Sequence, residues 1–139
     1  MVLVDASVWS LALRRRINAL SSAETLLTTE LERLIRRGET TIIGSVRQEV
    51  LSGIRDDRAF NAILSFLSAF PLLPTRAEDY DRAAAFYNIC RARGITGTAT
   101  DMLICSVASA HDEPVFTTDR DFARYAVHLP IRLYEIDSN

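Results

Sequence analysis

Short apolar runs alternate with longer helix-type patterns along the whole 139-residue chain. The runs at 2–4, 41–43, 72–73, 114–116 and 131–136 are rich in Val, Ile, Leu and Phe, as buried strands usually are. Helical periodicity fills the stretches between these runs. The alternation predicts an α/β fold in which a mostly parallel sheet of about five strands is covered by helices on both faces.

Several helix starts carry side chains that can cap them. Two match the capping-box pattern, in which a hydroxyl and a Glu or Gln side chain three residues later satisfy each other's backbone N–H groups: Ser21 with Glu24, and Ser45 with Gln48. Periodicity and these caps predict helices at about 7–16, 22–37, 45–53, 57–70, 78–93, 98–110 and 119–126.

Length and composition fit one soluble domain over residues 1–139. About half of the residues, 48%, are hydrophobic, which is enough for a core without disulfides. No signal peptide is expected because Asp5 interrupts the first apolar run, and no run approaches the ~20 apolar residues that span a bilayer. A cytoplasmic protein is therefore expected. The formal net charge of −2 does not by itself indicate a nucleic-acid binder.

Acidic residues follow the predicted strands. Asp5 comes directly after the first strand, Glu49 lies in the helix after the second, Asp101 lies in the first turn of the 98–110 helix, and Asp119 and Asp121 follow the fourth strand. The carboxyl ends of parallel strands share one edge of a sheet, where ligands bind. Crowded carboxylates stay ionised beside a cation, and oxygen ligands suit Mg²⁺ or Mn²⁺. Such a site activates water for attack on a phosphodiester.

The same acids have an ordinary structural interpretation. Asp5, Asp101 and Asp119 stand where helix caps or first-turn acids are favoured, and Glu49 fits an exposed helical position. Spacing alone leaves both interpretations open, although the common edge favours metal binding.

Three other classes of protein have acids or phosphate sites at strand ends, and this chain lacks the residues that each of them requires. A receiver domain needs a lysine, and all sixteen basic residues here are arginine. A haloacid-dehalogenase-type phosphatase needs an Asp two positions after its first-strand Asp, where this chain has Ser7. A dinucleotide-binding domain needs a G-x-G-x-x-G turn after that strand, and none is present.

Four motifs, in order and over essentially the whole chain, resemble those of the PIN-domain family, and specifically VapC-type toxins of bacterial toxin–antitoxin pairs. They are the opening strand with Asp-x-Ser-hydrophobic-Trp at 2–9, Glu-hydrophobic-Leu-x-Gly at 49–53, the Asp-x-Leu-Ile-x-x-x-Ala type of helix at 100–108, and Thr-x-Asp-x-Asp-Phe at 117–122. The resemblance implies a three-layer α/β/α PIN-like fold, with the whole chain as a single PIN domain.

The resemblance also implies roles for individual residues. Asp5, Glu49, Asp101 and Asp119 match the family's catalytic, metal-coordinating acids, and Asp121 matches a more variable acid that binds metal directly or through water. Ser7 and Thr117 match small polar positions that support the site.

The activity implied is Mg²⁺- or Mn²⁺-dependent endoribonuclease cleavage of RNA such as tRNA or rRNA, which stops translation. A VapB-type antitoxin covers the site of such toxins, and the expected unit is a homodimer or a larger hetero-oligomer with the antitoxin. Two alternatives stay open: a PIN nuclease in RNA processing without an antitoxin, and a catalytically degenerate module that binds RNA or a partner.

Two further surfaces are candidates for contacts with other molecules. The candidate RNA-binding residues are arginines that flank the predicted site, namely Arg14, Arg15, Arg16, Arg91 and Arg93. The 57–70 helix is apolar over a wide arc, which indicates either a second surface against a partner or a helix deep in its own fold.

Overall fold

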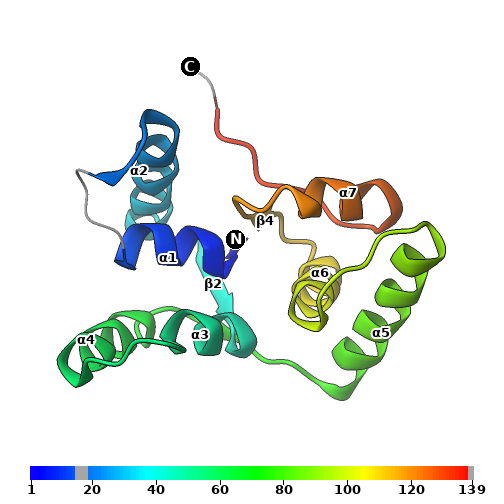
Figure 1. Ribbon diagram of the computed structural model, residues 1–139, viewed down its shortest axis with the longest axis horizontal. Helices are drawn as coiled ribbons and strands as arrows, with labels where there is room; N and C mark the ends of the chain where they lie inside the picture. Colours follow the sequence, from blue (N-terminus) through cyan, green and yellow to red (C-terminus); the bar gives the residue numbers. More distant parts are fainter. Residues whose placement is uncertain (15–18, 138–139) are drawn as a thin grey trace.

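Strands and helices alternate along the chain in the computed structural model, which describes residues 1–14 and 19–137. In chain order the elements are β1 (Val2–Val4), α1 (Ala6–Arg14), α2 (Ser22–Arg36), β2 (Thr40–Ile43), α3 (Gly44–Leu51), α4 (Asp57–Leu67), β3 (Leu72–Leu73), α5 (Ala77–Ala92), α6 (Ala99–His111), β4 (Val115–Phe116) and α7 (Asp121–His128) (Figure 1). No helix in these described ranges is long and apolar enough to cross a membrane.

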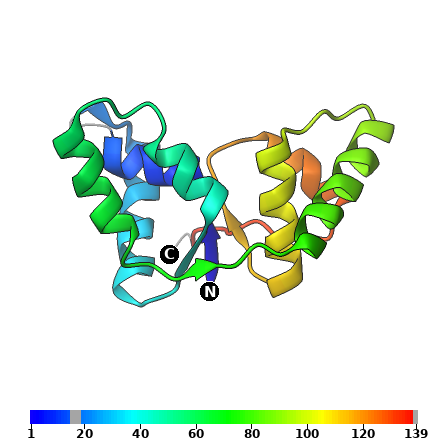
Figure 2. The same ribbon diagram turned by 90° about the horizontal axis from the view of Figure 1, so that it is seen from below.

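The sheet is parallel and has the strand order β3-β2-β1-β4. Leu3 at its centre lies opposite Thr41 of β2 and Val115 of β4. The chain builds outward from β1 to β3 and then returns to add β4 on the other side of β1. Because crossovers between parallel strands are right-handed, this reversal places the helices on opposite faces. Figure 2 shows α1 to α4 on one side and α5 to α7 on the other, as predicted for an α/β/α fold.

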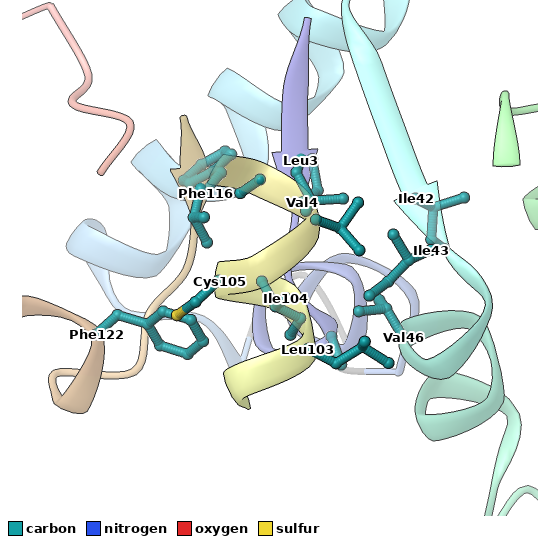
Figure 3. Packing of buried hydrophobic residues seen from close by; sticks show 14 of the residues in the cluster. Leu3, Val4, Ile42, Ile43, Val46, Leu103, Ile104, Cys105, Phe116 and Phe122 are labelled. Atoms are coloured by element: carbon teal, nitrogen blue, oxygen red, sulfur yellow. The ribbon is translucent and has the colours of Figure 1, made fainter. Parts of the chain in front are cut away.

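The core lies between the sheet and these helices. All residues of β1 and β2 are buried, and α6 is buried continuously from Met102 to Ala108. A helix that is apolar all round belongs inside a fold. Figure 3 shows its Leu103 and Ile104 among Val4 and Ile43 of the strands. The central strands and α6 are therefore fixed by packing; Asp5 directly follows β1, and Asp101 lies in the first turn of α6.

The predicted fifth strand does not form. Leu133 makes one isolated parallel bridge with Val115, supported by bonds from Val115 N–H to the Arg132 carbonyl (2.9 Å) and from Tyr134 N–H to the Val115 carbonyl (2.8 Å). Because β4 is only two residues long, it offers no further pairing. The sheet of the described residues thus has four strands rather than about five.

One of the two predicted capping boxes forms. The Ser21 hydroxyl accepts from the Glu24 N–H and the Glu24 carboxylate from the Ser21 N–H, both at 3.1 Å. The prediction for Ser45 was wrong. β2 passes directly into α3, so the N-cap is Ile43, which offers no side-chain bond, and Ser45 lies inside the helix.

Candidate active site

Asp5 directly follows β1 and lies at the point where the strand order reverses. Its side chain is buried, with the residue 6% exposed. Its Oδ2 accepts hydrogen bonds from the hydroxyls of Ser7 and Thr117, each at 2.8 Å. These hydroxyls accept in turn from the backbone N–H groups of Thr118 and Asp119, each at 3.0 Å. A hydroxyl has one proton to donate, so these acceptor bonds direct both protons toward Asp5.

Asp101 lies in the first turn of α6. The hydroxyl of Thr98 caps this helix by accepting from the Asp101 N–H at 3.0 Å. The Asp101 Oδ2 accepts from the phenol of Tyr125 at 2.8 Å. Burial raises the pKa of Asp101, hydrogen bonds from Tyr125 and Thr98 lower it, and the negative charges of Asp119 and Asp5 raise it further, giving a net increase.

Glu49 and Asp119 approach the same place from α3 and from the loop after β4. Partial desolvation raises the pKa of Glu49, and the charges of Asp5 and Asp101 add to the increase. The Oδ1 of Asp119 accepts from the N–H of Asp121, the first residue of α7, at 2.9 Å. The acids therefore interact electrostatically although they come from four separate segments.

Four predicted acids share one cleft. It has a volume of about 220 Å³ and is lined by Asp5, Ala6, Ser7, Ser10, Glu49, Asp101 and Asp119. Asp121 is not among the lining residues; its Oδ1 lies 3.8 Å from Arg124 Nη1 one helical turn later. Thr117 supports the cleft from behind Asp5. The structure thus brings together four of the five predicted metal ligands, and the fifth is not among the described lining residues.

The chemistry of the lining suits a hard divalent cation. Its polar atoms are carboxylate and hydroxyl oxygens, and no basic side chain is among the described lining residues. Oxygen donors of this kind are what Mg²⁺ and Mn²⁺ take. Within residues 1–14 and 19–137, however, no three His, Cys, Asp or Glu side chains stand close enough together to hold a metal ion without adjustment. The acids line a common cleft without forming a finished coordination shell.

The predicted RNA-binding arginines lie outside the cleft where they are described. Arg91 is exposed near the end of α5 and its Nη1 is 3.4 Å from the Thr96 hydroxyl, and Arg93 is exposed at the cap of the same helix. Arg14 ends α1. Its side chain, like all of Arg15 and Arg16, lies outside the described residues.

Two residues near the acids were not predicted. Ser10 lines the cleft and lies one helical turn after Ser7, so the helical period of α1 is a signal that could have found it. Tyr125 carries no such signal, because a buried aromatic on an amphipathic helix is ordinarily a core residue.

Comparison with known proteins identifies the family. A family model for the PIN domain matches residues 2–128. The chain therefore belongs to the PIN-domain family, as its motifs predicted.

Solved structures have the same fold. FitAcB from Neisseria gonorrhoeae superposes with a TM-score of 0.70 at 19% identity, covering 97% of each chain. VapBC2 from Rickettsia felis, bound to a DNA fragment from its promoter, gives 0.73 at 19% identity, covering 99% of this chain and 100% of the other. FitAB bound to the IR36 DNA fragment gives 0.74 at 18% identity, with 99% and 98% covered. The comparison with curated proteins finds no match.

Proposed function

We propose that this PIN domain is a Mg²⁺- or Mn²⁺-dependent endoribonuclease, the toxin of a VapBC-type toxin–antitoxin pair. It hydrolyses phosphodiester bonds in tRNA or rRNA and thereby inhibits translation in the cytoplasm. PIN domains are generally nucleases and typically use divalent metal ions. The observation that carries the proposal is the cleft, where four carboxylates from four segments meet without a basic residue in the described lining.

Asp5, Glu49, Asp101 and Asp119 would hold the cation. When bound, the cation supplies charge neutralisation for the substrate phosphate and a water of lowered pKa. The chain's own hydrogen bonds orient the acids: Ser7 and Thr117 hold Asp5. Ligating carboxylates in metal sites are commonly held this way. We assign no direct metal contact to Asp121, whose carboxylate approaches Arg124 and is not part of the described cleft lining.

An antitoxin is the proposed partner. The neighbours FitAcB and VapBC2 carry names of two-component complexes, which supports a VapB-type protein for this chain. An apolar groove of about 310 Å³ between α1, α2 and α4 is a suitable docking place. Phe66 at its wall is 39% exposed. The Trp9 indole N–H, in the same wall, is buried and has no hydrogen-bond partner among the described residues.

The wide apolar arc predicted for the 57–70 helix is partly used inside the fold. Trp9 packs on Phe66 and Phe70 with ring centroids 6.3 and 5.0 Å apart. The exposed remainder of Phe66 belongs to the groove proposed for the antitoxin. The homodimer is a separate proposal, supported by an apolar cleft of about 420 Å³ between α5 and α6, beside which Tyr80 is 57% exposed.

Cleavage by the purified protein tests the activity. The protein is incubated with tRNA and rRNA in Mn²⁺, Mg²⁺ or EDTA. We expect metal-dependent cleavage that falls by about 100-fold in Asp5→Asn and Asp101→Asn. Asp57→Asn is the matched control, because Asp57 is an exposed acid in the first turn of α4, outside the cleft. Cleavage in EDTA, or full activity of the Asp5 variant, would falsify the mechanism.

Induction in cells tests the biological assignment. The protein expressed alone should arrest growth, the Asp5→Asn variant should not, and mapping of RNA ends after brief induction should reveal the target. Cleavage in vitro combined with unaffected growth would contradict the toxin assignment and leave the nuclease assignment in place.

A further inference from the structure

Tyr125 of α7 is buried behind the candidate site, with 1% of its surface exposed. Its ring packs edge-on against Phe122, with centroids 5.2 Å apart, as a phenylalanine could. What a phenylalanine lacks is the hydroxyl, which donates to Asp101 Oδ2 at 2.8 Å. Among the described residues this is the only hydrogen bond of that hydroxyl. Core packing therefore accounts for the aromatic ring, and the hydrogen bond to Asp101 accounts for the hydroxyl.

Gly97 leaves space for the end of the Met102 side chain and for the phenol of Tyr125. A Cβ atom at this buried position would lie 2.6 Å from Met102 Cε, 3.3 Å from the Tyr125 hydroxyl oxygen and 3.4 Å from its Cε1. Backbone conformation does not require glycine here, since its φ is not in the left-handed range. The requirement is steric: any larger residue presses on the Tyr125 ring at its polar end and on the methionine beside it.

The arrangement repeats the one around Asp5. There, two hydroxyls hold Oδ2 of the buried acid. Here, one buried hydroxyl on α7 holds Oδ2 of the acid on α6, while Thr98 fixes the backbone of the same residue. A carboxylate with one oxygen held by a rigid, buried donor has a defined orientation toward the cleft. Outer partners of this kind tune metal affinity.

We propose that Tyr125 is a positioning residue, whose hydroxyl orients Asp101 for binding of a divalent cation, and that Gly97 keeps open the space this hydroxyl needs. The inference rests on the proposed function, since it assigns Asp101 to the metal. Tyr125 itself touches neither substrate nor metal.

Tyr125→Phe tests the hydroxyl with the ring retained. Mn²⁺ binding is measured by calorimetry and by electron paramagnetic resonance of free Mn²⁺, together with thermal unfolding in EDTA and RNA cleavage. We expect the Mn²⁺ dissociation constant to rise about tenfold. Cleavage should fall at low Mn²⁺ and recover at saturating Mn²⁺, a recovery that loss of folded protein would not produce.

Tyr134→Phe is the matched control. The Tyr134 phenol also donates to a buried carboxylate, that of Glu30, and it lies outside the cleft. This variant should bind Mn²⁺ as the wild type does. Gly97→Ala is the second test, because it keeps the phenol but crowds it. This variant should also weaken Mn²⁺ binding. It tests the proposal even if Tyr125→Phe fails to fold.

The outcomes separate this inference from the function on which it rests. If the wild type binds Mn²⁺ and Tyr125→Phe binds it equally well, the positioning role is wrong while the nuclease assignment stands. If Tyr134→Phe weakens Mn²⁺ binding as much as Tyr125→Phe does, the cause is a general loss of stability, and the positioning role is also wrong. A wild type that neither binds Mn²⁺ nor cleaves RNA overturns both proposals.

Discussion

The Asp5 carboxylate accepts a 2.8 Å hydrogen bond from the hydroxyl of Thr117, a residue 112 positions further along the chain. The same hydroxyl accepts from the Asp119 N–H at 3.0 Å. One side chain thus links the acid at the end of β1 to the loop that presents the acid after β4. The two predicted metal ligands at the strand-order reversal depend on it jointly.

Thr117→Val should loosen both acids. We expect Mn²⁺ affinity to fall about tenfold and the free energy of unfolding to fall by about 1–2 kcal/mol, because the valine neither donates to Asp5 nor accepts from Asp119. Thr117→Ser keeps the hydroxyl and should retain most of both quantities. Calorimetric titration and urea unfolding measure them. Equal Mn²⁺ affinity in the valine and serine variants would contradict the prediction.

Two serines with buried hydroxyl oxygens should respond to alanine in opposite directions. The Ser45 hydroxyl lies inside α3 with no hydrogen-bond partner among the described residues, so Ser45→Ala should raise the free energy of unfolding by about 0.5–1 kcal/mol. The Ser106 hydroxyl donates to the Asp79 carbonyl at 2.7 Å and accepts from Arg82 at 3.2 Å. Ser106→Ala should therefore cost about 1–3 kcal/mol.

Urea unfolding of both variants at one pH and temperature checks this pair. The prediction fails if Ser106→Ala stabilises the protein, or if Ser45→Ala destabilises it as much as Ser106→Ala does. Either result would show that the hydrogen-bond partners of a serine do not decide whether its replacement raises or lowers the free energy of unfolding.

The sequence predicted the features that follow from the regular topology of a parallel sheet. Apolar runs marked the four strands, and parallel pairing alone required the acids after them to share an edge, so Asp5 and Asp119 meet as expected. Position after β4 alone does not separate Asp119 from Asp121, and only the resemblance to the PIN-domain family ranked Asp121 as the more variable acid. The structure separates the two acids because α7 begins at Asp121, and helical geometry places the Asp121 side chain one turn before Arg124.

The errors in the sequence predictions have local physical causes. Ser45 matches a capping pattern, but β2 runs into α3 without a loop, and the apolar Ile43 takes the cap position. Tyr125 could not be found, because its role comes from contact with Asp101 on another helix, and no spacing within α7 records that contact.

Asp79 should make stability depend on pH in the acid range. The Arg76 N–H donates to its Oδ2 at 2.9 Å and Arg82 to its Oδ1 at 3.0 Å, and these bonds hold the pKa of the buried carboxyl below its usual value. The unfolded chain takes up this proton near pH 4, before the native protein does. The stabilisation is therefore complete above that pH and is lost as the pH falls through the lowered native pKa.

Asp79→Asn removes this titrating group. The variant should be less stable than the parent by about 1–3 kcal/mol at pH 7. The difference should narrow as the pH is lowered from about 5 to about 3, because only the parent loses the ionised carboxylate. Urea unfolding at several pH values measures the difference. A gap that stays constant over this range would mean that the ionised carboxylate does not carry the stabilisation.

Metal should reverse the effect of Asp101→Asn on stability. Without metal, burial and the neighbouring acids disfavour the charged Asp101, which is why its pKa is raised. Asparagine is uncharged, has nearly the same shape and can still accept from Tyr125, so in EDTA the variant should be about 0.5–1 kcal/mol more stable than the parent. Mn²⁺ at 100 times its dissociation constant should stabilise the parent by about 2.7 kcal/mol and the variant by far less.

Urea unfolding in EDTA and in Mn²⁺ measures both differences, with Asp57→Asn as the exposed acid that should follow the parent in each condition. The reversal is expected because the same repulsion that destabilises the metal-free cleft is what a cation relieves. An Asp101→Asn variant that is less stable in EDTA, yet gains as much from Mn²⁺ as the parent, would place the cation elsewhere and remove Asp101 from its ligands.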